Sequence, residues 1–377
     1  MTGPSITFAG GPIFDGTELH DGYAARFRDG VFDALVPEHQ IARDDQIEDL
    51  AGQILSPGYV DLQVNGGGGV MFNDDPSVDT LAQIATAHRG LGATRILPTL
   101  ITDTPEKTRA SIDAAVEAVQ AGIPGIAGLH LEGPHLSERR KGAHDAALIR
   151  PMQPEDLDAI LKAAKHLPAL MVTLAPENTT LDQVDALTRA GVIVSLGHTD
   201  APFETCMAFA KAGAQCATHL FNAMSQLGSR EPGLVGAALS CGSMSAGLIA
   251  DGIHVHPDTM RTAWAAKRGP GQIFLVSDAM AVAGTSQTEF HLEGRLIRRE
   301  NGRLTLQDGT LAGADLCLTK AIQVLTEQVG VPLAEALAAA TSVPHRMIAN
   351  ASDELKPTLS HMIRIATDLS EARPVSH

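Results

Sequence analysis

The chain has 377 residues, of which 44% are hydrophobic and 3% aromatic, and its formal net charge is −16. This length supports a large core, and the negative charge argues against non-specific binding to nucleic acid or anionic membranes. The four cysteines show no paired spacing, which argues against a disulfide framework or a cysteine-based zinc site.

The sequence shows no run of about 18 apolar residues and no charged start followed by an apolar segment. We therefore expect neither a membrane span nor a signal peptide, and we predict a cytoplasmic protein.

Residues 1–55 contain short apolar stretches separated by Gly, Asp and Pro turns, which predicts a small β unit. Thereafter apolar runs alternate with Ala-rich, helix-like segments, several of which end in glycine. The runs lie at 58–64, 93–101, 125–133, 169–177, 191–199, 214–220, 245–254 and 272–280. Eight strands alternating with helices predict a (β/α)8 TIM barrel over residues 56–346, with an open doubly wound sheet as the alternative.

After the eighth predicted strand, the segment at about 288–312 has the pattern of an inserted β-hairpin. Residues 332–349 then resemble a helix, and the stretch "LSHMIRIATDL" predicts a strand that returns to the N-terminal β unit. The expected organisation is thus a small β-sandwich domain built from residues 1–55 and about 347–377, joined to the barrel.

Ionisable residues follow several predicted strands. Glu132 ends the third strand, and the fifth to eighth end in His198, His219, His254 and Asp278. Each one alone is more simply explained as a cap or a structural residue, but barrel enzymes carry their chemistry at the carboxyl ends of the strands. One carboxylate with two imidazoles can hold a catalytic zinc, which lowers the pKa of a bound water to near 7. Asp278 would then serve as general base and acid.

Other candidates carry weaker signals. "GGGG" at 66–69 lacks the Lys and Ser/Thr of a phosphate-binding P-loop. We expect His135 and Arg139 only to solvate their loop.

Several ordered motifs carry a family resemblance: "HLEGPH" with "KGAH", "SLGHTDA", "THLFNAM", "REPGLVG", "ADGIHV", "VSDAM" and "GTLAGA". In this order, over residues 52–345, they resemble the N-acetylglucosamine-6-phosphate deacetylases of the amidohydrolase superfamily. The resemblance implies hydrolysis of the acetamide of N-acetylglucosamine 6-phosphate to glucosamine 6-phosphate and acetate, in amino-sugar catabolism or cell-wall recycling.

The resemblance also implies residue roles. Glu132, His198 and His219 match the ligands of one divalent metal per subunit, with Zn²⁺ expected first and Fe²⁺, Co²⁺ or Mn²⁺ as alternatives. Asp278 matches the catalytic acid/base, and His144 matches the residue that polarises the acetamide carbonyl. The matches to sugar and phosphate contacts are Ala143, Asn222, Ala223, Asp251, His254, Leu311, Ala312 and Gly313.

Arg230 matches an arginine that reaches the phosphate in the neighbouring active site, so the resemblance implies a homodimer. We also expect a helix after "FNAM", whose N-terminus would add backbone N–H groups at the phosphate.

The first strand ends in Gln63 and Asn65, where many amidohydrolases carry the two histidines that hold a second metal. Neutral amides are poor ligands for such an ion, so we expect a single metal.

Three other functions stay open. The first is the same chemistry on the galactosamine epimer. The second is a different hydrolase, such as a dihydroorotase or a nucleobase deaminase, which the missing histidine pair disfavours. The third is a non-catalytic paralogue, which the retained metal set and Asp278 disfavour.

Overall fold

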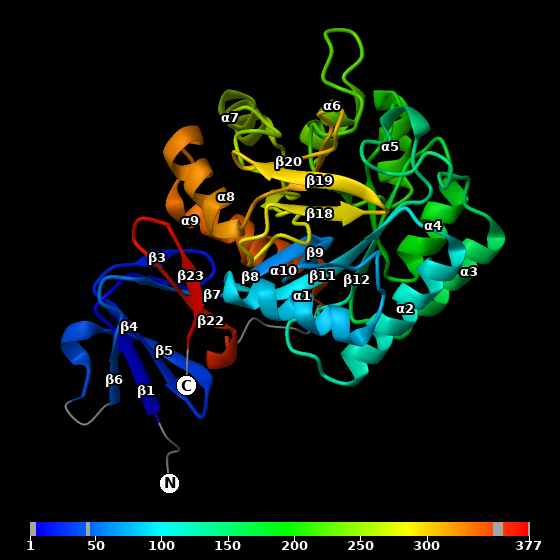
Figure 1. Ribbon diagram of the computed structural model, residues 1–377. Coiled ribbons are helices and arrows are strands. Elements are labelled where there is room, and N and C mark those ends of the chain that lie inside the picture. The colour runs from blue at the N-terminus through cyan, green and yellow to red at the C-terminus, as the bar shows by residue number, and fades with distance from the viewer. Residues whose placement is uncertain (1–4, 43–45, 350–356, 376–377) are drawn as a thin grey trace.

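In the computed structural model, which describes residues 5–42, 46–349 and 357–375, eight parallel strands form a barrel (Figure 1). The strands pair in chain order, and a parallel bridge between Val64 and Ala279 links the first strand to the segment after the last. They are β8 (Tyr59–Val64), β11 (Ala93–Ile101), β12 (Leu129–Glu132), β13 (Leu170–Leu174), β14 (Ile193–Leu196), β15 (Cys216–Ala217), β16 (Ser245–Leu248) and β17 (Ile273–Leu275). The TIM barrel is confirmed, and the open doubly wound alternative is excluded.

Helices surround the barrel (Figure 1). They are α1 (Val78–Gly90), α2 (Pro105–Gln120), α3 (Pro154–Ala163), α4 (Leu181–Arg189), α5 (Phe203–Lys211), α6 (Gly233–Ser240), α7 (Pro257–Ala266), α8 (Leu318–Val324), α9 (Leu333–Ala340) and α10 (Ser342–Ile348). A π-helical turn, η3 (Leu325–Val329), follows α8, and the expected single helix at 332–349 is two helices, α9 and α10. None of the helices in the described ranges is long and apolar enough to cross a membrane.

Local sequence signals explain where strands and helices begin and end. Every residue of β8, β13 and β14 is buried, as expected for barrel strands covered on both faces. Helix α4 begins at a capping box in which Thr180 and Gln183 bond each other's backbone N–H groups, and it ends before Gly191 in the left-handed region.

The small β unit lies beside the barrel and combines strands from the N-terminal and C-terminal parts of the chain (Figure 1). One sheet contains β1 (Ser5–Ala9), β4 (Tyr23–Arg28), β5 (Val31–Pro37) and β6 (Gln46–Asp49). The other contains β2 (Ile13–Phe14), β3 (Leu19–His20), β7 (Ile54–Pro57), β22 (Met362–Ile365) and β23 (Ala372–Pro374). Phe8, Phe27, Leu55 and Met362 share one apolar cluster, so the two sheets form a sandwich.

The predicted C-terminal strand is confirmed, because β22 pairs antiparallel with β7. The domain boundaries at residues 55 and about 347 stay predictions. Residues 350–356 of the proposed C-terminal part, and residues 1–4 where no signal peptide was expected, lie outside the described ranges.

The insertion after the barrel is larger than the expected hairpin. It forms a four-stranded antiparallel sheet of β18 (Glu289–Leu292), β19 (Arg295–Glu300), β20 (Arg303–Thr305) and β21 (Leu311–Ala314). Its apolar side chains Phe290, Leu292, Ile297 and Leu304 cluster with residues that follow the last barrel strand. The sheet therefore lies over one end of the barrel. The "GGGG" stretch forms a second, two-stranded element of β9 (Gly66–Gly67) and β10 (Val70–Met71).

Candidate active site

A cavity of about 250 Å³ lies at the carboxyl ends of the barrel strands and contains most of the predicted site residues. Its lining includes Glu132, Ala143, His144, His198, His219, Asn222, Ala223, His254, Asp278, Leu311 and Gly313. The structure thus brings together on one surface residues that are up to 181 positions apart in sequence.

Three ligand-type atoms converge in this cavity. Glu132 Oε1 lies 3.3 Å from His198 Nε2 and 3.2 Å from His219 Nε2, and the two Nε2 atoms are 3.0 Å apart. All three residues are at most 4% exposed. Ligand atoms about 2.0–2.1 Å from a tetrahedral zinc lie about 3.3 Å from one another, so this triangle fits a metal with one open position.

The tautomer of His198 fits the same conclusion. His198 Nδ1–H donates to the carbonyl oxygen of Arg140 over 2.7 Å, which leaves the lone pair of Nε2 directed at the triangle. His219 Nδ1 is buried and has no hydrogen-bond partner among the described residues. We conclude that Glu132, His198 and His219 form a cluster able to hold a divalent metal.

The turn after Glu132 requires glycine. Gly133 has φ +94°, and a Cβ there would lie 2.2 Å from Thr102 Oγ1. The Gly-Pro sequence therefore turns the chain sharply where the strand ends, and it leaves the carboxylate on a rigid strand.

Several site residues depart from ordinary backbone conformation. His198, His219 and Asp278 have φ values of 46°, 28° and 50°, in the region that L-residues rarely adopt. These conformations end the strand ladders early. That is why β14, β15 and β17 are shorter than the predicted strands, although the buried sequence continues into the loops.

Asp278 is held by two amides at the carboxyl end of the first barrel strand, β8. Its Oδ1 accepts from Asn65 Nδ2 at 2.7 Å and from Gln63 Nε2 at 3.2 Å. Gln63 Nε2 also donates to Glu132 Oε1 at 3.1 Å, so one amide links the two carboxylates. Burial, followed by the negative charge of Glu132, raises the pKa of Asp278 to about 6. A carboxyl with such a pKa is suited to take up and release a proton near neutral pH.

His144 presents a donor to the cavity. Its Nδ1 accepts from the Thr102 backbone N–H at 3.3 Å and lies 2.8 Å from Thr102 Oγ1, so the proton is on Nε2. That Nε2 is 4.0 Å from Glu132 Oε2. Burial, and then the charge of His198, lower the pKa of His144 to about 3. The ring is therefore neutral at pH 7 and can donate one hydrogen bond from Nε2–H into the site.

The other predicted contacts come from the loop that carries His254 and from strand β21 of the inserted sheet. His254 Nδ1–H donates to Asp251 Oδ2 at 2.6 Å, which fixes the ring while Nε2 stays available. Gly313 has φ +65°, and a Cβ there would meet Asp278 O at 2.8 Å, so the "LAG" stretch packs directly against the base.

Three predicted substrate contacts do not line the cavity. Asp251 lies behind His254, and Ala312 is fully buried in an apolar cluster. Arg230 is exposed in the loop between β15 and α6, which projects beyond the barrel (Figure 1).

The helix expected after "FNAM" is α6. Residues 221–223 form a turn, and α6 begins only at Gly233. The backbone N–H groups of Gly233 and Leu234 already donate to Glu231 Oε1 at 3.0 Å and Ser225 Oγ at 2.7 Å. The backbone N–H groups at the N-terminus of α6 therefore already have hydrogen-bond partners within the chain.

His135 was also predicted wrongly, because it is buried and its Nδ1–H donates to Arg150 O at 3.0 Å. Sequence reasoning missed the roles of Gln63, Asn65 and Thr102. The signal was available for the first two, because alternate residues of a strand face the same side and would point at Asp278 together.

The comparisons with known proteins agree with this geometry. Residues 54–350 match the model of the amidohydrolase family, and the chain belongs to that family. It is 42% identical to an N-acetylgalactosamine-6-phosphate deacetylase of Shewanella sp. (strain ANA-3), over 79% of this chain and 75% of the relative. It is 35% identical to an N-acetylglucosamine-6-phosphate deacetylase of Haemophilus influenzae, over 84% and 83%.

Solved structures show the same likeness over the whole fold. The crystal structure of the N-acetylglucosamine-6-phosphate deacetylase from Pasteurella multocida superimposes with a TM-score of 0.90 at 31% identity, covering 98% of this chain and 97% of that one. A Mycobacterium smegmatis enzyme of the same name, solved in complex with N-acetyl-D-glucosamine-6-phosphate, gives a TM-score of 0.87 at 29% identity with the same coverage.

Proposed function

We propose that the protein hydrolyses N-acetylglucosamine 6-phosphate to glucosamine 6-phosphate and acetate. The observation that carries this proposal is the buried triangle of Glu132, His198 and His219, which shares one cavity with Asp278 and His144. The names of the relatives supply the substrate class. The missing histidine pair, replaced by Gln63 and Asn65, supports a single metal and disfavours the dihydroorotase and deaminase alternatives.

A divalent cation held by Glu132, His198 and His219, with Zn²⁺ expected first, would lower the pKa of water to near 7 and polarise a carbonyl. Asp278 would take a proton from the attacking water and return it to the departing amine. His144 Nε2–H would donate to the acetamide oxygen as negative charge develops on it. Gln63 and Asn65 would keep the Asp278 carboxylate oriented throughout.

The substrate contacts follow from the cavity lining. Ala143, Asn222, Ala223, His254, Leu311 and Gly313 would surround the sugar and phosphate, with Asp251 fixing the His254 ring and Ala312 packing behind Leu311. We further propose a homodimer in which the exposed Arg230 reaches the partner's phosphate site. The cytoplasmic location stays a prediction.

The test is primary-amine release by protein of known metal content, with N-acetylglucosamine 6-phosphate and unphosphorylated N-acetylglucosamine as substrates. We expect rapid release only from the phosphorylated sugar. Absence of release from any phosphorylated acetamido sugar by metal-containing protein would contradict the proposal and favour a non-catalytic paralogue.

The galactosamine epimer is the second candidate, because the 42% identical relative carries that name. The ratio of kcat/KM for the two phosphorylated epimers decides between them. We expect the ratio to favour the glucosamine compound, and a ratio that favours the galactosamine compound would replace the proposed substrate.

A further inference from the structure

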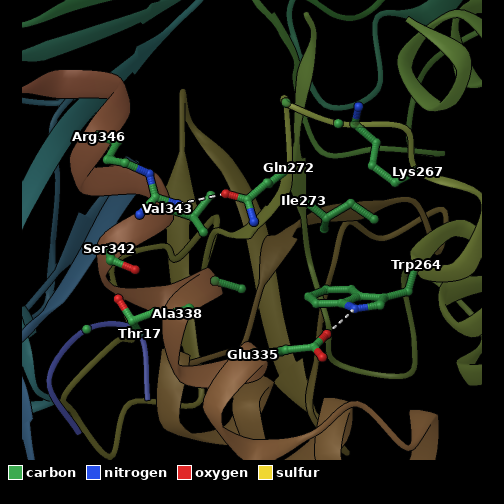
Figure 2. A pocket seen from close by; sticks show the side chains of 14 residues that line it. Thr17, Trp264, Lys267, Gln272, Ile273, Glu335, Ala338, Ser342, Val343 and Arg346 are labelled. Atoms are coloured by element: carbon green, nitrogen blue, oxygen red, sulfur yellow. Dashed lines mark hydrogen bonds between the residues drawn. The ribbon is translucent and has the colours of Figure 1, made fainter. Parts of the chain in front are cut away.

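A second cavity, of about 450 Å³, lies at the opposite end of the last barrel strand (Figure 2). Ile273, the first residue of β17, lines it, whereas Asp278 follows the other end of that strand. Its walls come from three distant parts of the chain: residues 16–17, 264–273 and 335–346. The volume is in the range of small-molecule sites, and none of its lining residues belongs to the active site.

Opposite charges face this cavity from two sides (Figure 2). The indole of Trp264 forms one wall, and its Nε1–H donates to Glu335 Oε2 over 3.2 Å. On the other side, Arg346 Nη2 donates to Gln272 Oε1 over 2.7 Å, which uses one of the five guanidinium donors. The ammonium of Lys267 donates instead to the carbonyl oxygens of Cys241 and Arg268, so Arg346 is the cation that the cavity offers.

A buried hydroxyl lacks a partner at the same place. Ser342 is 5% exposed, and its Oγ makes no hydrogen bond among the described residues. Ser342 and Thr17 both line this cavity (Figure 2). Buried polar groups in native structures are nearly always hydrogen-bonded, so an ordered water or a bound molecule supplies the partner that this hydroxyl lacks.

We propose that this cavity binds a hydroxylated ring compound that carries one cationic and one anionic group, of the chemical class of an amino-sugar phosphate. The ammonium lies at Glu335, the phosphate at Arg346, the apolar face of the ring on Trp264, and a ring hydroxyl at Ser342. Glucosamine 6-phosphate has all four features, and choosing it as the ligand rests on the proposed function. The N-acetylated compound lacks the ammonium and binds more weakly here.

Trp264 is the single tryptophan of the chain, so indole fluorescence reports on this cavity and not on the active site. The experiment titrates the full-length protein with glucosamine 6-phosphate, glucose 6-phosphate and glucosamine. We expect a saturable fluorescence change with the first compound and at least tenfold weaker binding of the other two. A flat titration with glucosamine 6-phosphate overturns the proposal.

Substitutions distinguish a ligand-binding site from a cavity that binds no ligand. Arg346→Gln is expected to weaken binding at least tenfold, while Arg189→Gln, at an exposed position at the end of α4, leaves it unchanged. Ser342→Ala weakens binding without lowering the thermal midpoint, because the hydroxyl has no structural partner to lose. Unchanged affinity in both Arg346→Gln and Ser342→Ala contradicts the assignment.

Deacetylation is measured in parallel and is expected to be unaffected by Arg346→Gln. If the protein deacetylates the substrate but its fluorescence does not change on titration, the proposed function stands and the second site is contradicted. If the protein binds glucosamine 6-phosphate through Arg346 but releases no amine, the second site stands and the proposed function is contradicted.

Discussion

The two cavities at the two ends of strand β17 differ in how far their charged residues are buried. At its carboxyl end, Asp278 and the Glu132, His198 and His219 cluster are almost completely buried and take one another as partners, and three of these four residues have left-handed backbone conformations. At its amino end, Glu335 and Arg346 are exposed. Burial strengthens electrostatic interactions and strain fixes geometry, so the first arrangement suits catalysis. The second is suited only to binding.

The largest effect is expected for loss of a ligand from the metal triangle. His219→Ala removes one of three converging donors, so metal content should fall far below that of the wild type and turnover should fall to background. Metal analysis after gel filtration, together with amine release, measures both. His166→Ala, at an exposed position, is the matched control. Full metal content in His219→Ala would show that His219 is not a metal ligand.

A smaller effect is expected for the amide that orients the base. Asn65→Ala removes the 2.7 Å hydrogen bond to Asp278 Oδ1 and should lower kcat by about 10–100-fold with metal retained. A donor to a carboxylate favours its charged form, so its loss raises the pKa of Asp278. The acidic limb of the pH–rate profile should therefore move to higher pH. An unshifted limb would show that Asn65 does not act through Asp278.

A still smaller effect is expected at Thr102. Thr102→Val removes the hydroxyl 2.8 Å from His144 Nδ1 but keeps the backbone N–H that also holds this nitrogen. We expect a decrease in kcat of about tenfold, as for the loss of a group that orients a catalytic residue. Thr102→Ser should restore most of the activity. If the serine variant were as slow as the valine variant, hydroxyl loss would not be the cause.

The smallest change tests the strand-end turn through stability. Gly133→Ala and Gly294→Ala both place a Cβ at positive φ, which costs about 1–2 kcal/mol. Only the first also creates a clash, with Thr102 Oγ1, whereas the second has no atom within 4 Å of the new Cβ. Urea unfolding should therefore show a greater loss of free energy of unfolding in Gly133→Ala. Equal losses would mean that the turn relaxes freely.

The features of the fold that follow from the periodicity of apolar residues could be predicted from the sequence. Strands alternating with helices gave the barrel and the strand order, and the rule that barrel chemistry lies at strand ends brought Glu132, His198, His219 and Asp278 together. The sequence did not predict where β14, β15 and β17 stop, because buried loops with left-handed residues have the same apolar composition as strands.

Other features depend on tertiary contacts that no local pattern carries. The sequence predicts a hairpin instead of the four-stranded inserted sheet because β20 has only three residues and weak alternation. The start of α6 at Gly233 is not evident from the sequence because Ser225 and Glu231 cap it from the preceding loop. The second cavity joins residues 16–17 to residues 335–346, a proximity that only the packed fold creates.

The most direct test of the central claim is metal reconstitution of the wild type and Asp278→Asn in parallel. Both proteins are stripped of metal and titrated with Zn²⁺, and bound metal and amine release from N-acetylglucosamine 6-phosphate are recorded at each step. We predict one bound metal per chain in both proteins, with wild-type activity rising in proportion to it and reaching a plateau at one equivalent. Asp278→Asn should stay at least about 100-fold slower at full occupancy. Near-normal turnover by the metal-loaded variant, or wild-type activity independent of bound metal, would contradict the account.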